Sequence, residues 1–143
     1  MSGKRVTPQE ARELCDQEGY VYLDVRSIPE FEQGHPKGAY NIPLLHFSGG
    51  RMAPNQEFLE VVKKAFPTDA RLAVGCKSGG RSAQAVSVLE QHGYANLVDV
   101  RGGFGGEFDR MGQCVVPGWG AAGLPVAATP EPGRTYQELK SKP

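Results

Sequence analysis

A chain of 143 residues is most simply one domain, and a chain of this length can bury roughly two-thirds of its unfolded surface. Lys and Arg number 16 and Asp and Glu number 16, so the formal charge is zero. That balance argues against a nucleic-acid-binding module and against an acidic disordered tail, and we expect no nucleic-acid partner. Apolar residues make up 39 %, enough for a globular core, and the 19 glycines and 11 prolines stay below the low-complexity range.

Three cysteines are present, Cys15, Cys76 and Cys114, too few and too scattered for a disulfide framework or a CxxC metal site. An odd number of thiols is typical of a reducing compartment. Residues 1–10 contain no apolar stretch of the kind found in signal peptides, and no apolar run approaches the ~18 residues of a membrane span. We therefore expect a cytoplasmic protein without a membrane partner.

The first half of the chain alternates short helices and strands. Thr7 can cap a helix in which Pro8 takes the first position, and Glu10 completes a capping box. In chain order, the pattern predicts a helix from 8 to Gly19, a strand at 20–25, a short helix at 27–33, a turn at 34–38, a short strand at 41–45 and a loop at 48–54.

The second half continues the alternation and then changes in composition. It predicts a helix capped by Asn55 and ended by Pro67, a strand at 71–75, a glycine-rich turn at 76–81, a helix at 82–92, a strand at 96–100 and one short helix within 102–112. Such alternation implies an α/β fold with a central, mostly parallel sheet flanked by helices. We expect one domain over 1–126 and a tail over 127–143, which has little to bury and is mobile or laid along the surface.

The segment 72–82 (LAVGCKSGGRS) carries the chemistry. Cys76 follows an apolar strand and precedes a helix by one tight loop, the place where open α/β sheets form sites. Loop N–H groups, the helix N-terminus and nearby cations all favour a thiolate, which is the nucleophilic form of cysteine. The same loop can bind an oxyanion. The candidate site is therefore the nucleophile Cys76 with the substrate-binding residues Lys77, Ser78, Gly79, Gly80 and Arg81.

A structural interpretation is available for every cysteine. Free cysteines are commonly buried and inert, but a purely structural loop has no need to gather glycines and cations around Cys76. Cys15, on a helix face, and Cys114, in an irregular region, are interpreted as structural. Cys114 could serve as a resolving thiol for Cys76, although the spacing gives this idea no support.

The loop resembles the active-site loop of the rhodanese (thiosulfate sulfurtransferase) family, and the similarity extends over residues 6–126. Besides 72–82, the matching segments are 21–26 (VYLDVR), 30–31, 34–43 (GHPKGAYNIP), 102–103, Trp119 and 123–126 (GLPV). Three regions in the same order make the resemblance specific. The stretch between Gly103 and Trp119 is longer than in a minimal domain of this family, which leaves its local structure open.

The resemblance implies a rhodanese-like fold and a ping-pong sulfur transfer. Cys76 would take the outer sulfur of thiosulfate, or of a persulfide on a protein partner, and pass it to cyanide or a thiol. Lys77 and Arg81 would hold the anionic end of the donor, while the loop amides would stabilise the persulfide. Neither a metal nor an organic cofactor is implied.

The other residues singled out are interpreted as structural or surface residues. Asp24 and Arg26 sit at a strand end and are expected to form an ion pair or to brace the loop, and His35 is expected to cap or brace its turn. Trp119 is interpreted as an apolar plug. Two further histidines, His46 and His92, are interpreted as surface or interface residues.

Two rival functions share this fold. Dual-specificity phosphatases and arsenate reductases also place a Cys-to-Arg loop around an oxyanion, but their loop is one residue longer than the segment from Cys76 to Arg81. A smaller ring suits a sulfur atom, and the sequence places no acid near the loop to protonate a leaving alkoxide. A non-catalytic binding module is the second rival. Such modules commonly lose the cysteine that this chain keeps.

Overall fold

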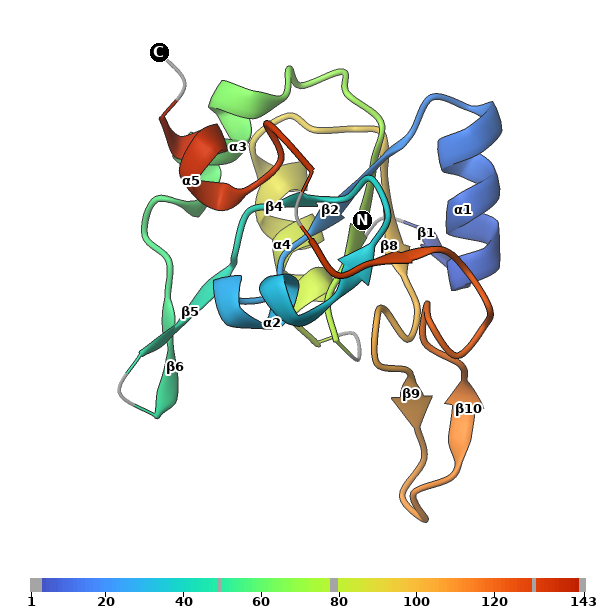
Figure 1. Ribbon diagram of the computed structural model, residues 1–143. Coiled ribbons are helices and arrows are strands. Elements are labelled where there is room, and N and C mark those ends of the chain that lie inside the picture. Colours follow the sequence, from blue (N-terminus) through green and yellow to red (C-terminus); the bar gives the residue numbers. More distant parts are fainter. Residues whose placement is uncertain (1–3, 49, 78–79, 130, 142–143) are drawn as a thin grey trace.

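The protein is built on a five-stranded sheet in which every neighbouring pair of strands is parallel (Figure 1). The computed structural model describes residues 4–48, 50–77, 80–129 and 131–141. The strand order is β1-β8-β7-β2-β4, with bounds Lys4–Val6, Leu97–Val100, Leu72–Gly75, Val21–Asp24 and Tyr40–Asn41. This confirms the α/β fold with a central parallel sheet and places β7, which precedes Cys76, in the middle of the sheet.

Five helices and three small two-stranded sheets complete the described structure. The helices are α1 (Pro8–Gln17), α2 (Ile28–Gln33), α3 (Phe58–Ala65), α4 (Gly80–Gln91) and α5 (Tyr136–Lys140). The small sheets pair β3 (His35–Pro36) with β11 (Val126–Ala127), β5 (Leu45–Ser48) with β6 (Arg51–Pro54), and β9 (Glu107–Phe108) with β10 (Cys114–Val116). In Figure 1, α2 and the two labelled hairpins lie toward the lower side, where the central strands end.

The pleat of the strands divides the core into two apolar layers. Successive side chains of a strand point to opposite faces. On one face Tyr22, Ala73 and Val98 pack with Ala11 of α1. On the other face alternate residues pack under α3, α4 and α5. They include Leu23, Leu72, Val74 and Leu97.

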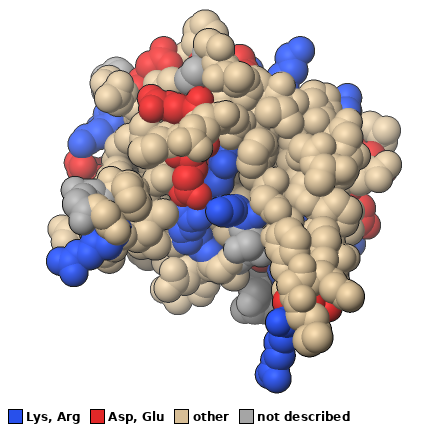
Figure 2. All heavy atoms as spheres, turned by 60° about the horizontal axis from the view of Figure 1, so that its bottom comes forward, with Lys and Arg blue, Asp and Glu red and all other residues tan. Residues whose placement is uncertain are grey.

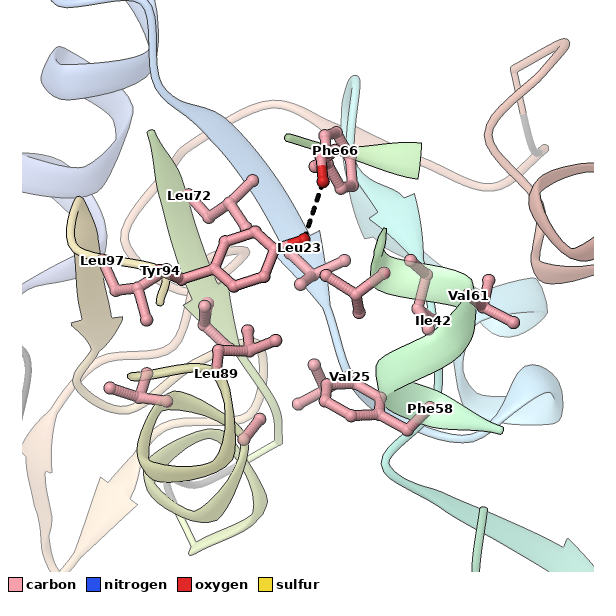
Figure 3. Packing of buried hydrophobic residues seen from close by; sticks show 14 of the residues in the cluster. Leu23, Val25, Ile42, Phe58, Val61, Phe66, Leu72, Leu89, Tyr94 and Leu97 are labelled. Atoms are coloured by element: carbon pink, nitrogen blue, oxygen red, sulfur yellow. Dashed lines mark hydrogen bonds between the residues drawn. The ribbon is translucent and has the colours of Figure 1, made fainter. Parts of the chain in front are cut away.

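The layer under α3 and α4 is closed by aromatic side chains. In Figure 3, Leu72, Leu89 and Tyr94 point toward one another between the sheet and α4. The Tyr94 hydroxyl donates a hydrogen bond of 2.7 Å to the carbonyl oxygen of Phe66. The buried phenol is thus satisfied at the end of α3, which ties the two helices together.

Several local predictions are confirmed. Thr7 and Glu10 form the expected capping box at the start of α1. The strands expected at 20–25, 71–75 and 96–100 are present with slightly shorter bounds. Helix α4 begins at Gly80, two residues before the predicted start.

Between 1 and 126 the structure differs from the sequence predictions in several places, among them 41–45, where β4 ends at Asn41 and β5 begins only at Leu45. The first strand, β1, was not expected, because three residues with one apolar side chain carry no periodic signal. Residues 48–54 are not a plain loop, since β5 and β6 form a hairpin there. The helix expected within 102–112 is replaced by turns and the β9–β10 hairpin, because Gly102, Gly103 and Gly106 adopt positive φ angles of 75°, 47° and 100°, incompatible with a helix.

The expectation that the tail buries little is also wrong. Helix α5 places Tyr136 and Leu139 in the core, with exposed fractions of 5 % and 1 %. Thr135 and Glu138 form a capping box at its start. The side-chain amide of Asn55 donates to the Tyr136 hydroxyl at 3.2 Å, so the tail is anchored beside α3. Two apolar residues three positions apart are sufficient to dock a short helix.

No helix among the described residues is long and apolar enough to cross a membrane.

Candidate active site

Cys76 lies directly after β7, at the carboxyl edge of the sheet, and its residue is only 1 % exposed. Lys77 is exposed, and Gly80 begins α4. Ser78 and Gly79, predicted to form part of the loop, lie outside the described residues. The strand–cysteine–helix order expected from the sequence is therefore present, with the sulfur at the end of a central strand.

The backbone of 103–105 supports the cysteine loop from the side. Phe104 donates its N–H to the carbonyl oxygen of Cys76 at 2.8 Å, and Gly105 donates to the carbonyl oxygen of Lys77 at 2.7 Å. A Cβ added to Gly103 would lie 2.0 Å from the Cys76 carbonyl oxygen. Only glycine allows this approach, since Gly103 also has a φ of +47°. The glycine pair at 102–103 thus fixes the position of the loop.

A serine and a buried aspartate lie behind the cysteine. The sulfur of Cys76 is 3.4 Å from the Ser82 hydroxyl oxygen, which is 2.6 Å from an oxygen of Asp99. Ser82, on α4, is fully buried, and Asp99, on β8, is 4 % exposed. Sequence reasoning missed both residues. The available signal was a carboxylate inside the apolar strand 97–100 (LVDV), a place where a charged side chain needs a partner.

Arg81 is held by an acid that the sequence did not reveal. Its two terminal guanidinium nitrogens donate to the two carboxylate oxygens of Glu30 at 2.6 and 3.1 Å. Glu30 also accepts from the backbone and the hydroxyl of Ser27. Burial raises the pKa of Glu30, but the hydrogen bonds from Arg81 and Ser27 outweigh it and lower the pKa to about 2. The expectation of no acid near the loop is therefore wrong, although this acid is ionised at neutral pH and is no proton donor.

A pocket of about 280 Å³ opens beside the loop. Its wall combines charged side chains with one aromatic ring and is made by Arg26, Glu30, Gln33, Gly34, Lys77, Phe104 and Gly105. Among the ion pairs between described residues, none includes Lys77. Figure 2 shows Lys and Arg side chains gathered near the middle of this face, bordered by acidic ones. The pocket therefore offers a cation for an anionic ligand next to an apolar surface.

The Arg26 wall of the pocket is rigid. Asp24 and Arg26 form the expected ion pair, with 2.6 Å between the carboxylate and guanidinium atoms, and both are nearly fully buried. The same Arg26 nitrogen donates to the carbonyl oxygen of Gly34 at 2.8 Å. The guanidinium also lies 4.4 Å from the centre of the Phe104 ring. These contacts fix the pocket wall, as expected for a bracing role.

The other singled-out residues lie in structural positions. His35 is buried, stacked on Phe31, with Nδ1 2.8 Å from the carbonyl oxygen of Phe31, which confirms bracing. Trp119 is buried against Tyr22 and donates to the carbonyl oxygen of Pro125 at 2.6 Å. His92, exposed on α4, lies 2.9 Å from the carbonyl oxygen of Val88. His46 lies on β5, where its ring contacts that of Tyr136.

The remaining thiols are placed on other elements. Cys15 is half-buried on α1, where burial and the nearby Asp16 raise its pKa to about 11. Cys114 is exposed on β10, and all three cysteines are free. Within the described part of the chain, no group of three or more His, Cys, Asp or Glu side chains is placed to hold a metal ion. Of the three cysteines, Cys76 is the one that precedes a residue of the pocket wall, Lys77, in the chain.

The comparison with family models settles the family. The model described as "Rhodanese-like domain" matches residues 7–106, which is most of the chain and includes the loop after β7. The chain belongs to the rhodanese-like family. Its single parallel-sheet domain with the cysteine loop at the sheet edge is the architecture that this membership implies, which confirms the resemblance found in the sequence.

Named relatives are similar over much of the chain. "Thiosulfate sulfurtransferase 16, chloroplastic" of Arabidopsis thaliana is 37 % identical over 110 residues, covering 77 % of this chain and 82 % of the relative. "Thiosulfate sulfurtransferase GlpE" of Haemophilus influenzae is 32 % identical over 129 residues, covering 90 % and 99 %. The chain spans only 51 % of "Senescence-associated protein DIN1" of Raphanus sativus, to which it is 40 % identical over 94 residues. These names support a rhodanese-like sulfurtransferase in general terms.

A solved structure confirms the fold. The crystal structure of Rv0390 from M. tuberculosis superposes with a TM-score of 0.74 at 29 % identity, covering 90 % of this chain and 99 % of that one. The rhodanese-like structure thus includes nearly the whole of this chain.

Proposed function

We propose that this protein is a sulfurtransferase that carries sulfur as a persulfide on Cys76. The observation that supports it best is the placement of Cys76 at the carboxyl end of the central strand, directly before Lys77, a cation that lines the pocket. Family membership and the names of the relatives agree with this chemistry. The donor is thiosulfate or a persulfide on another protein, and the acceptor is cyanide or a thiol.

The reaction consists of two displacements. The thiolate of Cys76 attacks the outer sulfur of thiosulfate, the sulfur–sulfur bond of the donor breaks, and sulfite leaves with the electron pair. In the second step, cyanide attacks the outer sulfur of the persulfide. Thiocyanate leaves, and the Cys76 thiolate returns with the bonding electrons. Neither displacement requires a metal or an organic cofactor.

The two cations have different roles in this proposal. Lys77 lines the pocket and binds the sulfonate end of thiosulfate as a charge-assisted donor. Arg81 is shared with Glu30, so the net charge that it offers to a donor is smaller. Ser78, Gly79 and Gly80 supply loop N–H groups that stabilise the anionic persulfide.

The size of the pocket supports an acceptor larger than cyanide. A water molecule occupies roughly 30 Å³ in the liquid. The pocket volume of about 280 Å³ is therefore larger than the volume that thiosulfate, an anion of five atoms, would fill. Phe104 offers an apolar surface to the carbon skeleton of a thiol acceptor or to the loop of a protein partner that carries a persulfide.

A cytoplasmic location stays a prediction.

The test is a thiosulfate–cyanide assay that measures thiocyanate. The parent protein should turn over, and Cys76→Ser should be inactive with an unchanged circular dichroism spectrum. Cys114→Ser and Cys15→Ser, which remove thiols on other elements, serve as matched controls and should keep most of the activity. Turnover by Cys76→Ser would contradict the proposal.

Phosphatase activity is tested in parallel with p-nitrophenyl phosphate. We expect no hydrolysis, since the segment from Cys76 to Arg81 is one residue shorter than the loop of the phosphatases and suits a sulfur atom better than a tetrahedral phosphate. A parent protein that releases p-nitrophenol but no thiocyanate would instead support the phosphatase alternative. A parent protein inactive in both assays would support a binding module.

A further inference from the structure

A chain of two short contacts joins the cysteine to a buried carboxylate. Cys76 Sγ is 3.4 Å from Ser82 Oγ, and Ser82 Oγ is 2.6 Å from Asp99 Oδ1. The three residues come from the end of β7, from the first turn of α4 and from β8. All three are less than 5 % exposed, so bulk water does not compete for these contacts.

The direction in which the Ser82 hydroxyl donates its proton decides how these contacts affect the thiol of Cys76. A serine hydroxyl has a single proton to donate, and an ionised carboxylate can only accept. A hydrogen bond from a hydroxyl to a carboxylate is stronger than one to a neutral group, and 2.6 Å is a typical length for it. Ser82 therefore gives its proton to Asp99 and turns an oxygen lone pair toward the sulfur. That arrangement accepts a hydrogen bond from the thiol and gives none to a thiolate.

We propose that Asp99, acting through Ser82, is a positioning residue that sets the fraction of Cys76 in the thiolate form. While Asp99 is ionised, the Ser82 hydroxyl donates its proton to the carboxylate and cannot donate it to the thiolate. If Asp99 is neutral, Ser82 turns its hydroxyl to the sulfur and stabilises the thiolate. The inference deepens the proposed function, and its consequence for turnover rests on that function, although the ionisation of the thiol does not.

The two oxygens of the Asp99 carboxylate face the Ser82 hydroxyl and the Arg5 guanidinium. Arg5, on β1, lies 3.6 Å from the second carboxylate oxygen and 3.5 Å from Glu107 of β9, which also pairs with Arg101. Burial raises the pKa of Asp99 above its usual value, and the hydrogen bond from Ser82 and the charge of Arg5 oppose this effect only in part. The carboxylate thus lies between one hydroxyl and one cation, with Oδ1 facing Ser82 and Oδ2 facing Arg5.

The experiment measures the rate of iodoacetamide alkylation at Cys76 against pH, with the labelled peptide quantified by mass spectrometry. In Asp99→Asn, which preserves shape and removes the charge, the midpoint of the profile should fall by about one pH unit. The plateau at high pH should fall about threefold, since a less basic thiolate is less nucleophilic. Glu107→Gln is the matched control, because it removes a carboxylate from the same Arg5 without touching Ser82. Its midpoint should stay at the parent value.

Ser82→Ala separates an effect through the hydroxyl from an effect through space. In the parent background, Ser82→Ala should leave the midpoint unraised, since the hydroxyl gives the thiolate nothing while Asp99 is ionised. In the Asp99→Asn background, the same change should raise the midpoint by about one unit, because it removes the new donor. If Asp99→Asn does not fold, Ser82→Ala alone remains a test, and a midpoint raised by a unit or more would overturn the proposal.

Three further results would overturn the inference. The first is an unchanged midpoint in folded Asp99→Asn. The second is a raised midpoint in that variant, which would make Asp99 the proton acceptor for the thiol. The third is a shift of the midpoint by Asp99→Asn that is equal with and without the Ser82 hydroxyl. The proposed function fails separately. If the alkylation profile shifts as expected but the parent forms no thiocyanate, the control of ionisation stands and sulfur transfer does not.

Discussion

Replacing Leu139 with alanine should destabilise the whole domain, although the residue lies in the last five positions of the chain. Its side chain is 1 % exposed and packs in the layer under α3. Removing a buried leucine costs about 2–5 kcal/mol, and a terminal helix of five residues can settle into part of the gap, so about 2–3 kcal/mol is expected.

That loss of stability converts to a measurable temperature. An unfolding entropy of roughly 2.1 cal/mol/K per residue makes 1 kcal/mol worth about 3 °C in a chain of this length, so Tm should fall by about 7–10 °C. Thermal unfolding followed by circular dichroism measures it. Gln137→Ala is the matched control, since Gln137 is exposed on the same helix, and it should change Tm by only about 1–2 °C. If Leu139→Ala melts with the parent, α5 is not part of the cooperative core.

The remaining predictions concern the site. Lys77→Ala should lower kcat/KM for thiosulfate roughly ten- to a hundredfold, the value of one charge-assisted contact, and Arg81→Ala should lower it further because it leaves the Glu30 carboxylate beside the donor. Gly103→Ala should lower the rate of sulfur transfer at least tenfold, since the added Cβ would displace the Cys76 carbonyl. Steady-state kinetics on the folded variants measures all three effects. The ionised Glu30 should add about 1–2 kcal/mol to the free energy of unfolding above pH ~4.5. This contribution is lost as the pH falls toward the folded pKa of about 2, and urea unfolding at pH 7 and pH 3 would measure the loss.

The predictions for Arg81, Gly103 and Glu30 each have an internal control. Adding Glu30→Gln to Arg81→Ala should recover part of the lost kcat/KM, and no recovery would mean that the carboxylate does not repel the donor. Gly133→Ala introduces the same kind of strained φ with open space around its Cβ, so it should retain activity. Glu30→Gln alone should lose less stability than the parent between pH 7 and pH 3. An equal loss would place the acid sensitivity elsewhere.

The parts of the site that were predictable are contiguous in the chain. The strand at 72–75, the cysteine and the helix that follows occupy one segment, so their order in space follows from their order in sequence. The partners of that segment come from elsewhere. Glu30 reaches Arg81 across 51 positions and Asp99 reaches Ser82 across 17, and such pairings depend on the packing of α2 and β8, which local patterns do not specify.

Two errors had signals in the sequence that were outweighed by composition. Thr135 and Glu138 stand at capping-box spacing before two apolar residues, but the prolines and charges around them favoured a mobile tail. In 102–112 a short helix was expected despite the glycines, whereas Gly102, Gly103 and Gly106 adopt positive φ angles in a turn beside the backbone of Cys76 and Lys77. Those glycines serve the close approach of two backbones, which is a tertiary requirement.

The most direct test of the central proposal is the intact mass of the protein after incubation with thiosulfate. If loop N–H groups and nearby cations stabilise a persulfide anion as proposed, the intermediate should survive long enough to be weighed. We expect the mass of one added sulfur atom, located on Cys76 by peptide mapping and removed by cyanide. Added sulfur on Cys15 or Cys114, or an unchanged mass under conditions in which thiocyanate forms, would contradict sulfur transfer through Cys76.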